Sequence, residues 1–132
     1  MSLSSASILK DGTIGVTGGT AKAFTRIGGD LNVAKCVFDG TNYLDRTEAI
    51  FTRKEPQPVG SSPDGYSKVR RYVYLKVPKV LAYGETVYDY VKVEFARSVE
   101  TTAAETTTLL ITASQLFSDS DFADFWESGA ND

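Results

Sequence analysis

The sequence contains no histidine and only one cysteine, Cys36. The absence of histidine excludes Ser-His-Asp triads, Cys-His dyads and nearly every zinc site. A single cysteine cannot form an intrachain disulfide, and free cysteine is among the most buried residue types, so we expect Cys36 in the core of a strand. The sequence therefore predicts no enzyme, no bound metal and no cofactor.

Long apolar runs are also missing. No uninterrupted stretch approaches the roughly 20 residues that a membrane helix needs, so no membrane partner is expected. The N-terminus, MSLSSASILKDG, has neither a basic start nor a long apolar segment and is not predicted to be a signal peptide. The composition is nevertheless 42% hydrophobic and 11% aromatic, which is enough for a folded core. The length of 132 residues suits a single domain, 1–132.

Lysine and arginine are absent from the last quarter of the chain. Residues 1–98 contain 14 Lys and Arg against 10 Asp and Glu, a balance of +4, whereas residues 99–132 contain seven acids and no base. Such an asymmetry indicates two surfaces with different partners. The alternative is that the acidic end only keeps the protein in solution.

The first 98 residues read as short strands separated by turns. The segments Ser5–Leu9 and Thr13–Thr17 flank Lys10-Asp11-Gly12 and predict an N-terminal β-hairpin within residues 1–20. Residues 21–98 predict an antiparallel sheet. Its first three strands are expected at Ala21–Ile27, Val33–Phe38 and Arg46–Lys54, followed by a surface loop at Glu55–Gly65.

Two longer segments, Ser67–Val77 and Thr86–Ala96, alternate between apolar and polar residues. A period of two places one set of side chains on a buried face and the other on an open face. Arg71 and Asp89 are the charged exceptions on the apolar side. The open face carries cations and tyrosines: Lys68, Arg70, Tyr72, Tyr74 and Lys76 in the first segment, and Tyr88, Tyr90, Lys92 and Glu94 in the second.

The phase of Arg46–Lys54 is ambiguous. Either Ala49, Phe51 and Arg53 share a face with the open side of the longer strands, or Ile50, Thr52 and Lys54 do. The sequence leaves both alternatives open.

Residues 99–132 change to a helical period. Glu100–Phe117 predicts one helix that starts with a capping box at Thr101-Thr102 and Glu105, and a short second helix follows Ser118-Asp119-Ser120-Asp121 and ends at Gly129. The triple Thr106–Thr108 is poor helix material, so packing is expected to hold that turn. The apolar positions, assigned to core or dimer packing, are Leu109, Leu110, Ala113, Leu116 and Phe117 in the first helix and Phe122, Phe125 and Trp126 in the second.

Strands followed by helices define an α+β class with an antiparallel sheet. Two helices would cover one face of the sheet thinly, so we expect dimerisation in which the helices of one subunit lie across the sheet of the other. The acids Asp119, Asp121 and Asp124 lack the glycine and the terminal glutamate of a calcium loop, and helix capping explains them better.

The open face is the main candidate functional site. Arg70, Lys76 and Lys92 would bind phosphates, while Tyr72, Tyr74 and Tyr90 would stack on unpaired bases of a single-stranded nucleic acid. The alternative is an ordinary solvated sheet face, on which tyrosine and lysine are common.

Three features resemble the coat proteins of single-stranded RNA bacteriophages, the levivirus coat protein family. The first is Val77-Pro78-Lys79-Val80 directly after a long alternating strand, and the second is Tyr90-Val91-Lys92-Val93-Glu94-Phe95. The third is the order of an N-terminal hairpin, a meander of strands and two C-terminal helices. The connection at Pro78–Glu85 is short for the family, which leaves the size and pores of a shell open.

The resemblance implies an interlocked dimer with one continuous sheet covered by swapped helices, and an icosahedral shell built from such dimers. It implies that Arg70, Tyr72, Tyr74, Lys76, Tyr90, Lys92 and Glu94 face the RNA genome, with Tyr90 at the position of the family's base-stacking tyrosine. In many members this face also binds an RNA hairpin and represses translation of the replicase. The expected partners are further copies of the chain, the RNA and a phage maturation protein, in the virion and, during assembly, in the host cytoplasm. The alternative function is a small non-viral dimeric nucleic-acid-binding module.

Overall fold

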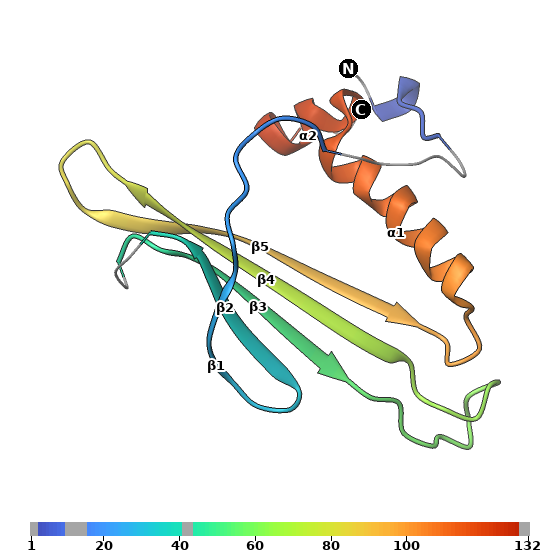
Figure 1. Ribbon diagram of the computed structural model, residues 1–132. Helices are drawn as coiled ribbons and strands as arrows, with labels where there is room; N and C mark the ends of the chain where they lie inside the picture. Colours follow the sequence, from blue (N-terminus) through green and yellow to red (C-terminus); the bar gives the residue numbers. More distant parts are fainter. Residues whose placement is uncertain (1–2, 10–15, 41–43, 130–132) are drawn as a thin grey trace. The chain divides into compact units, whose positions relative to one another are not determined.

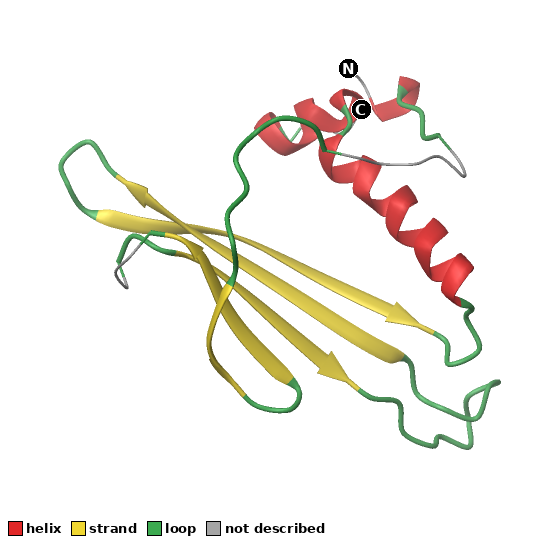
Figure 2. Cartoon of the chain, in the orientation of Figure 1, coloured by secondary structure: helices red, strands yellow, loops and turns green. Residues whose placement is uncertain are grey.

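The structure is a computed structural model that describes residues 3–9, 16–40 and 44–129. The chain divides into two compact units, one comprising Gly19–Glu100 and the other Met1–Gly18 together with Thr101–Asp132. Within the described residues the first unit holds all the strands and the second all the helices (Figures 1 and 2).

The strand unit is a five-stranded antiparallel meander in the order β1-β2-β3-β4-β5. The strands are β1 (Thr25–Gly29), β2 (Val33–Asp39), β3 (Thr47–Lys54), β4 (Val69–Val80) and β5 (Thr86–Arg97). The α+β class and the meander predicted from the sequence are confirmed, and four of the five strands fall where alternation placed them. The strand predicted at Ala21–Ile27 instead spans Thr25–Gly29.

Strand β4 runs three residues beyond its predicted end and passes through Pro78. The last β3 residue paired with β4 is Glu48, opposite Lys76, whereas Pro78 pairs only with Tyr88 of β5. A proline lacks the N–H that a second neighbouring strand would require, so a strand tolerates it where only one side is paired. The following turn closes with Gly84 at a φ of +94°, a left-handed conformation that glycine adopts without steric cost.

Few side chains of the sheet are buried in the single chain. The buried apolar residues among those described are Cys36, Ala49 and Val69, all in strands, as predicted for Cys36. On the same face the rings of Phe24 and Phe38 pack with centroids 5.1 Å apart. The thin core agrees with the expectation that a lone subunit covers its sheet incompletely.

The helical unit contains α1 (Ala103–Ser118), the 3₁₀ turn η2 (Ser120–Phe122) and α2 (Ala123–Ser128). Thr102 is the N-cap of α1 and forms the predicted capping box with Glu105, and Gly129 ends α2 at a φ of +77°. Asp119 caps η2 by accepting a hydrogen bond from the Asp121 amide. These caps confirm the predicted helix boundaries to within three residues.

The hydroxyls of the threonine triple bond to the backbone of their own helix. Thr106, Thr107 and Thr108 each donate a hydrogen bond of 3.0–3.1 Å to the carbonyl four residues earlier. This back-bonding fixes the side chains against their own helix. These bonds satisfy the three hydroxyls but do not add to the stability of the helix.

The N-terminal hairpin is the part of the prediction that the described residues contradict. Leu3–Ser5 forms a 3₁₀ turn, η1, and residues 6–9 form no strand. The Gln115 side chain accepts a hydrogen bond from the Leu9 amide at 2.8 Å and donates one to the Leu9 carbonyl at 2.9 Å. These are the two groups that a hairpin partner would use, so the strand predicted at Ser5–Leu9 is wrong. The turn Lys10-Asp11-Gly12 and most of Thr13–Thr17 lie outside the described residues.

Candidate nucleic-acid interface

The register between β4 and β5 brings the predicted site residues to one face of the sheet. Directly opposite pairs include Tyr72 with Glu94, Tyr74 with Lys92 and Lys76 with Tyr90. Opposite residues in an antiparallel pair point to the same side. We call this surface the tyrosine face; its β4 and β5 members are Arg70, Tyr72, Tyr74, Lys76, Tyr88, Tyr90, Lys92 and Glu94.

The register between β3 and β4 resolves the ambiguous phase of β3. Ile50 lies opposite Tyr74, Thr52 opposite Tyr72, and Lys54 opposite Arg70. Lys35 of β2 in turn lies opposite Ile50. The tyrosine face therefore includes Ile50, Thr52 and Lys54, and gains two cations, Lys35 and Lys54, that the sequence could not assign to it.

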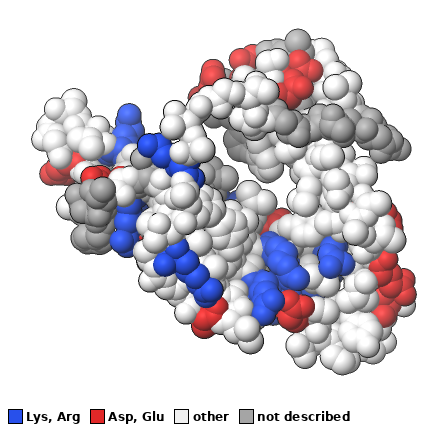
Figure 3. All heavy atoms as spheres, viewed as in Figure 1, with Lys and Arg blue, Asp and Glu red and all other residues white. Residues whose placement is uncertain are grey.

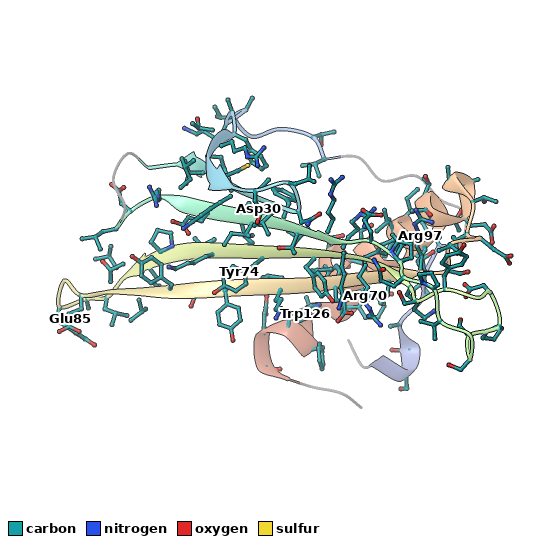
Figure 4. All side chains as sticks on the ribbon, turned by 90° about the horizontal axis from the view of Figure 1, so that it is seen from below. Asp30, Arg70, Tyr74, Glu85, Arg97 and Trp126 are labelled. Atoms are coloured by element: carbon teal, nitrogen blue, oxygen red, sulfur yellow. The ribbon has the colours of Figure 1, made fainter. Side chains whose placement is uncertain are left out.

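The aromatic rings on this face are arranged in contact with one another and with a cation. The rings of Tyr74 and Tyr90 are stacked with centroids 5.4 Å apart and an interplanar angle of 26°. Tyr90 is 65% exposed, so one side of this stack is open to solvent. The Lys76 ammonium lies 4.0 Å from the centroid of the Tyr88 ring, a cation–π contact. Figure 4 shows Tyr74 and Arg70 on the same strand.

Two carboxylates organise the cations of the face. Glu94 forms an ion pair with Arg70 across β4 and β5. The buried Glu48 accepts a hydrogen bond of 3.0 Å from the Arg46 guanidinium and lies 3.8 Å from the Lys35 ammonium. Glu94, predicted as an RNA-binding residue, is thus placed to hold Arg70 in position. The sequence did not identify Glu48 as a residue of this face, because only the pairing of β3 with β4 shows on which face of the sheet it lies.

Positive charge gathers on the strand unit. Figure 3 shows Lys and Arg over the strands, whereas the described residues of the helical unit show only acidic charges. The charge split seen in the sequence therefore corresponds to the two units. A cationic surface with exposed aromatic rings can bind phosphates and stack on unpaired bases.

The opposite face of the sheet is mostly apolar along β4 and β5 and is incompletely covered, although Arg26, Arg53, Lys79 and Arg97 also lie on it. Val77, Val87 and Val91 belong to it and are exposed, Val91 to 53%. Arg71 and Asp89 share this face, as the alternation predicted, and Arg71 forms a 3.5 Å ion pair with Glu55. Exposed valines on a sheet face indicate a surface that another element covers in the assembled protein.

The apolar residues predicted for packing on the helices are also largely exposed in the single chain. Leu110 is 49% exposed and Trp126 is 55% exposed, and Gln115 is the buried residue of α1. The Trp126 indole donates a 2.7 Å hydrogen bond to the Leu116 carbonyl. Together with Phe122 and Phe125 these two residues line an apolar groove of about 280 Å³. The predicted packing residues thus form an apolar helical surface that lacks a cover within their own unit.

A second polar network ties the long loop to the end of β5. Asp64 accepts hydrogen bonds from the Ser98 and Ser62 hydroxyls and from the Tyr66 amide. These bonds, with that of Ser98 the largest cause, lower the pKa of Asp64 from 3.8 to about 2. The loop predicted at Glu55–Gly65 is therefore anchored to the sheet.

Among the described residues no cluster of His, Cys, Asp or Glu is arranged to hold a metal ion. No helix among the described residues is long and apolar enough to cross a membrane.

No protein-family model matches the sequence, and no curated protein matches it. Solved structures do. The chain is 28% identical, with a TM-score of 0.86, to the virus-like particle of bacteriophage GQ-907, covering 99% of this chain and 100% of that one. The virus-like particle of bacteriophage AVE019 matches at 15% identity and a TM-score of 0.68, covering 88% and 92% of the two chains. A bacteriophage coat protein described as an unassembled RNA-binding dimer matches at 14% identity and a TM-score of 0.51, covering 95% and 93%.

A five-stranded antiparallel sheet followed by two helices is the architecture that this chain shares with these phage particle and coat proteins. The chain has the fold of the coat proteins of single-stranded RNA bacteriophages, and the resemblance inferred from the sequence is confirmed.

Proposed function

We propose that this chain is the capsid subunit of a single-stranded RNA bacteriophage and that copies of it assemble into a closed icosahedral shell. The observation that supports this function most strongly is the match to the particle protein of bacteriophage GQ-907, which extends over both chains almost completely. The match includes the sheet, both helices and the connections between them. The protein would then reside in the virion and, during assembly, in the bacterial cytoplasm.

The building block is a two-fold dimer. Strand β5 lies at the edge of the sheet and spans Thr86–Arg97, whereas the other edge, β1, has five residues and an irregular register. A long flat edge strand is a template for pairing with another chain. Pairing of two β5 strands would create the continuous sheet that the family resemblance implies. The exposed apolar residues of α1 and α2 would then cover the apolar sheet face of the partner.

The tyrosine face would bind the RNA genome inside the shell. Its described strands carry five cations, Lys35, Lys54, Arg70, Lys76 and Lys92, against two carboxylates, Glu48 and Glu94. The cations provide affinity through phosphates, and the exposed side of the Tyr74–Tyr90 stack receives an unpaired base. On the same face the protein would bind an RNA hairpin of its own genome and repress translation of the replicase, and a maturation protein would complete the particle.

The test is to express the chain alone in bacteria and purify it by size. We expect particles of megadalton mass in electron micrographs, with an ultraviolet absorbance ratio that shows packaged nucleic acid. A protein that remains a free dimer over a range of mild salt and pH conditions, yet binds RNA, would instead support the non-viral nucleic-acid-binding module.

A further inference from the structure

The apolar face of β5 carries two charged side chains near its ends, Asp89 and Arg97. The β4 residues directly opposite them are Val77 and Val69, which are apolar. On the tyrosine face Lys92 and Glu94 lie opposite Tyr74 and Tyr72. No charged residue of β4 therefore lies directly across from any of these four residues, although Arg97 donates a hydrogen bond to the Ser98 carbonyl and Glu94 forms an ion pair with Arg70.

A two-fold axis restricts how two β5 strands can pair. In one kind of register a single residue faces its own copy and all other pairs are spaced symmetrically about it; in the other kind the axis passes between two neighbouring residues. Shifting the pairing by a single step would join the tyrosine face of one copy to the apolar face of the other. The allowed registers are therefore those centred on a single residue of the strand.

The charges discriminate among these registers. Centring on Asp89, Lys92 or Glu94 places two like charges directly opposite each other, which destabilises a strand pair. Centring on Tyr90 or Val91 brings no opposite charges together within Thr86–Arg97. Centring on Val93 places Lys92 opposite Glu94 and Asp89 opposite Arg97, and the symmetry forms each pair twice.

We propose that the dimer is registered on Val93, with β5 pairing to its own copy through Lys92–Glu94 and Asp89–Arg97 ion pairs, one on each face of the sheet. This inference rests on the proposed dimer and specifies its interface. It accounts for Asp89, an acid on an apolar face that the RNA site does not use. It also places Glu94 between Arg70 of its own copy and the partner's Lys92, so that the two copies jointly order the cations of the RNA face.

Disulfide cross-linking of single-cysteine variants determines directly which β5 residue faces its own copy. In a Cys36→Ala background, Val91→Cys, Lys92→Cys and Val93→Cys are oxidised under mild conditions and analysed on non-reducing gels. A residue that faces its own copy brings two Cβ atoms within disulfide reach, so Val93→Cys should form a covalent dimer fastest. Faster cross-linking at Val91→Cys or Lys92→Cys overturns the register, and no cross-link in any variant that still dimerises overturns the β5 interface.

Charge reversal in trans provides a second test that does not depend on cysteine. Asp89→Arg alone and Arg97→Asp alone each create two repulsive contacts, and we expect each to weaken dimerisation at least tenfold. Co-expression of the two variants restores complementary charges in a mixed dimer, which should recover assembly. Lys79→Asp, on the same face of β4, is the matched control and should not rescue Asp89→Arg.

These experiments distinguish a wrong dimer register from a wrong proposed function. Particles in electron micrographs together with a different cross-linking position refute the register and leave the capsid function standing. Absence of both dimers and particles from the parent chain refutes the proposed function itself. Failure of the mixed variants to recover, with normal assembly of the parent, refutes the Asp89–Arg97 pairing.

Discussion

At the scale of single residues, the tyrosine face combines side chains with separate tasks. Tyr90 presents an open ring backed by Tyr74, while Lys76 is already engaged with the Tyr88 ring. The alternation in the sequence predicted that the cations and most tyrosines share a face, because side chains of a strand alternate in direction. It could not predict which residues of β3 join them, because that depends on the register of pairing.

Tyr90 is expected to act through its ring. Stacking of a base on an aromatic side chain contributes roughly 1–3 kcal/mol, so Tyr90→Ala should weaken RNA-hairpin binding about tenfold to a hundredfold, and Tyr90→Phe should cost much less. A binding titration of dimers with hairpins from the phage genome measures this. Tyr83→Ala, at an exposed residue of the turn before β5, is the control. Unchanged affinity of Tyr90→Ala would show that the ring is not a stacking site.

Lys92 is expected to act through phosphates. Lys92→Gln should weaken binding to all RNA sequences alike and lower the slope of log affinity against log salt by about one ion. Titrations at several salt concentrations give this slope, on variant protein that sedimentation shows to remain a dimer, because Lys92 also pairs with the partner's Glu94 in the proposed interface. Lys79→Gln, on the other face of the sheet, should leave the slope unchanged. A change in slope for Lys79→Gln and none for Lys92→Gln would place the RNA on the apolar face.

At the scale of elements, the sequence predicted strands and helices well where the signal was local. The capping box at Thr102 and Glu105 and the αL glycine at Gly129 specify helix ends through neighbouring residues. The N-terminal segment was predicted wrongly for the opposite reason. Its backbone bonds to Gln115, more than a hundred residues away, and no local pattern reveals such a partner.

Gln115 should therefore hold the N-terminal segment. Gln115→Ala removes two hydrogen bonds to Leu9, and we expect a loss of about 1–3 kcal/mol in the stability of that contact. Hydrogen exchange at the Leu9 amide should accelerate strongly. Ser118→Ala, which removes a hydroxyl bonded within α1, is the control and should leave Leu9 protected. Equal protection of the Leu9 amide in both variants would contradict the proposed role of Gln115 in holding the N-terminal segment.

The loop anchored by Asp64 should respond to acid. Hydrogen bonds lower the pKa of Asp64 in the folded protein to about 2, so the anchoring is fully present above the unfolded value of 3.8. It is lost as the pH falls from about 4 through 2, because protonation removes the carboxylate that accepts these bonds. The Tyr66 amide resonance should follow this titration with a midpoint near 2, and Asp64→Asn should abolish it. A midpoint near 4 would mean that the carboxylate is not engaged in solution.

At the scale of the whole molecule, the chain is expected to be an obligate dimer. Exposed apolar side chains on the sheet and on α1 predict that folding and association are coupled, so the unfolding temperature should rise with protein concentration. Thermal unfolding over a hundredfold range of concentration, with sedimentation at micromolar concentration, measures this. A folded monomer whose unfolding temperature does not depend on concentration would contradict it.

The sequence by itself determined the class of the protein. Its missing histidine excluded most catalytic sites, its alternation marked β4 and β5, and its helical period marked α1, because these properties depend on residue type and near neighbours. The tertiary structure decided what depends on distant residues: the phase of β3, the ion pairs of Glu48 and Glu94, and the Gln115 contact with Leu9. Pairing register and long-range hydrogen bonds join segments whose separation along the chain carries no periodic signal, so only the folded arrangement reveals them.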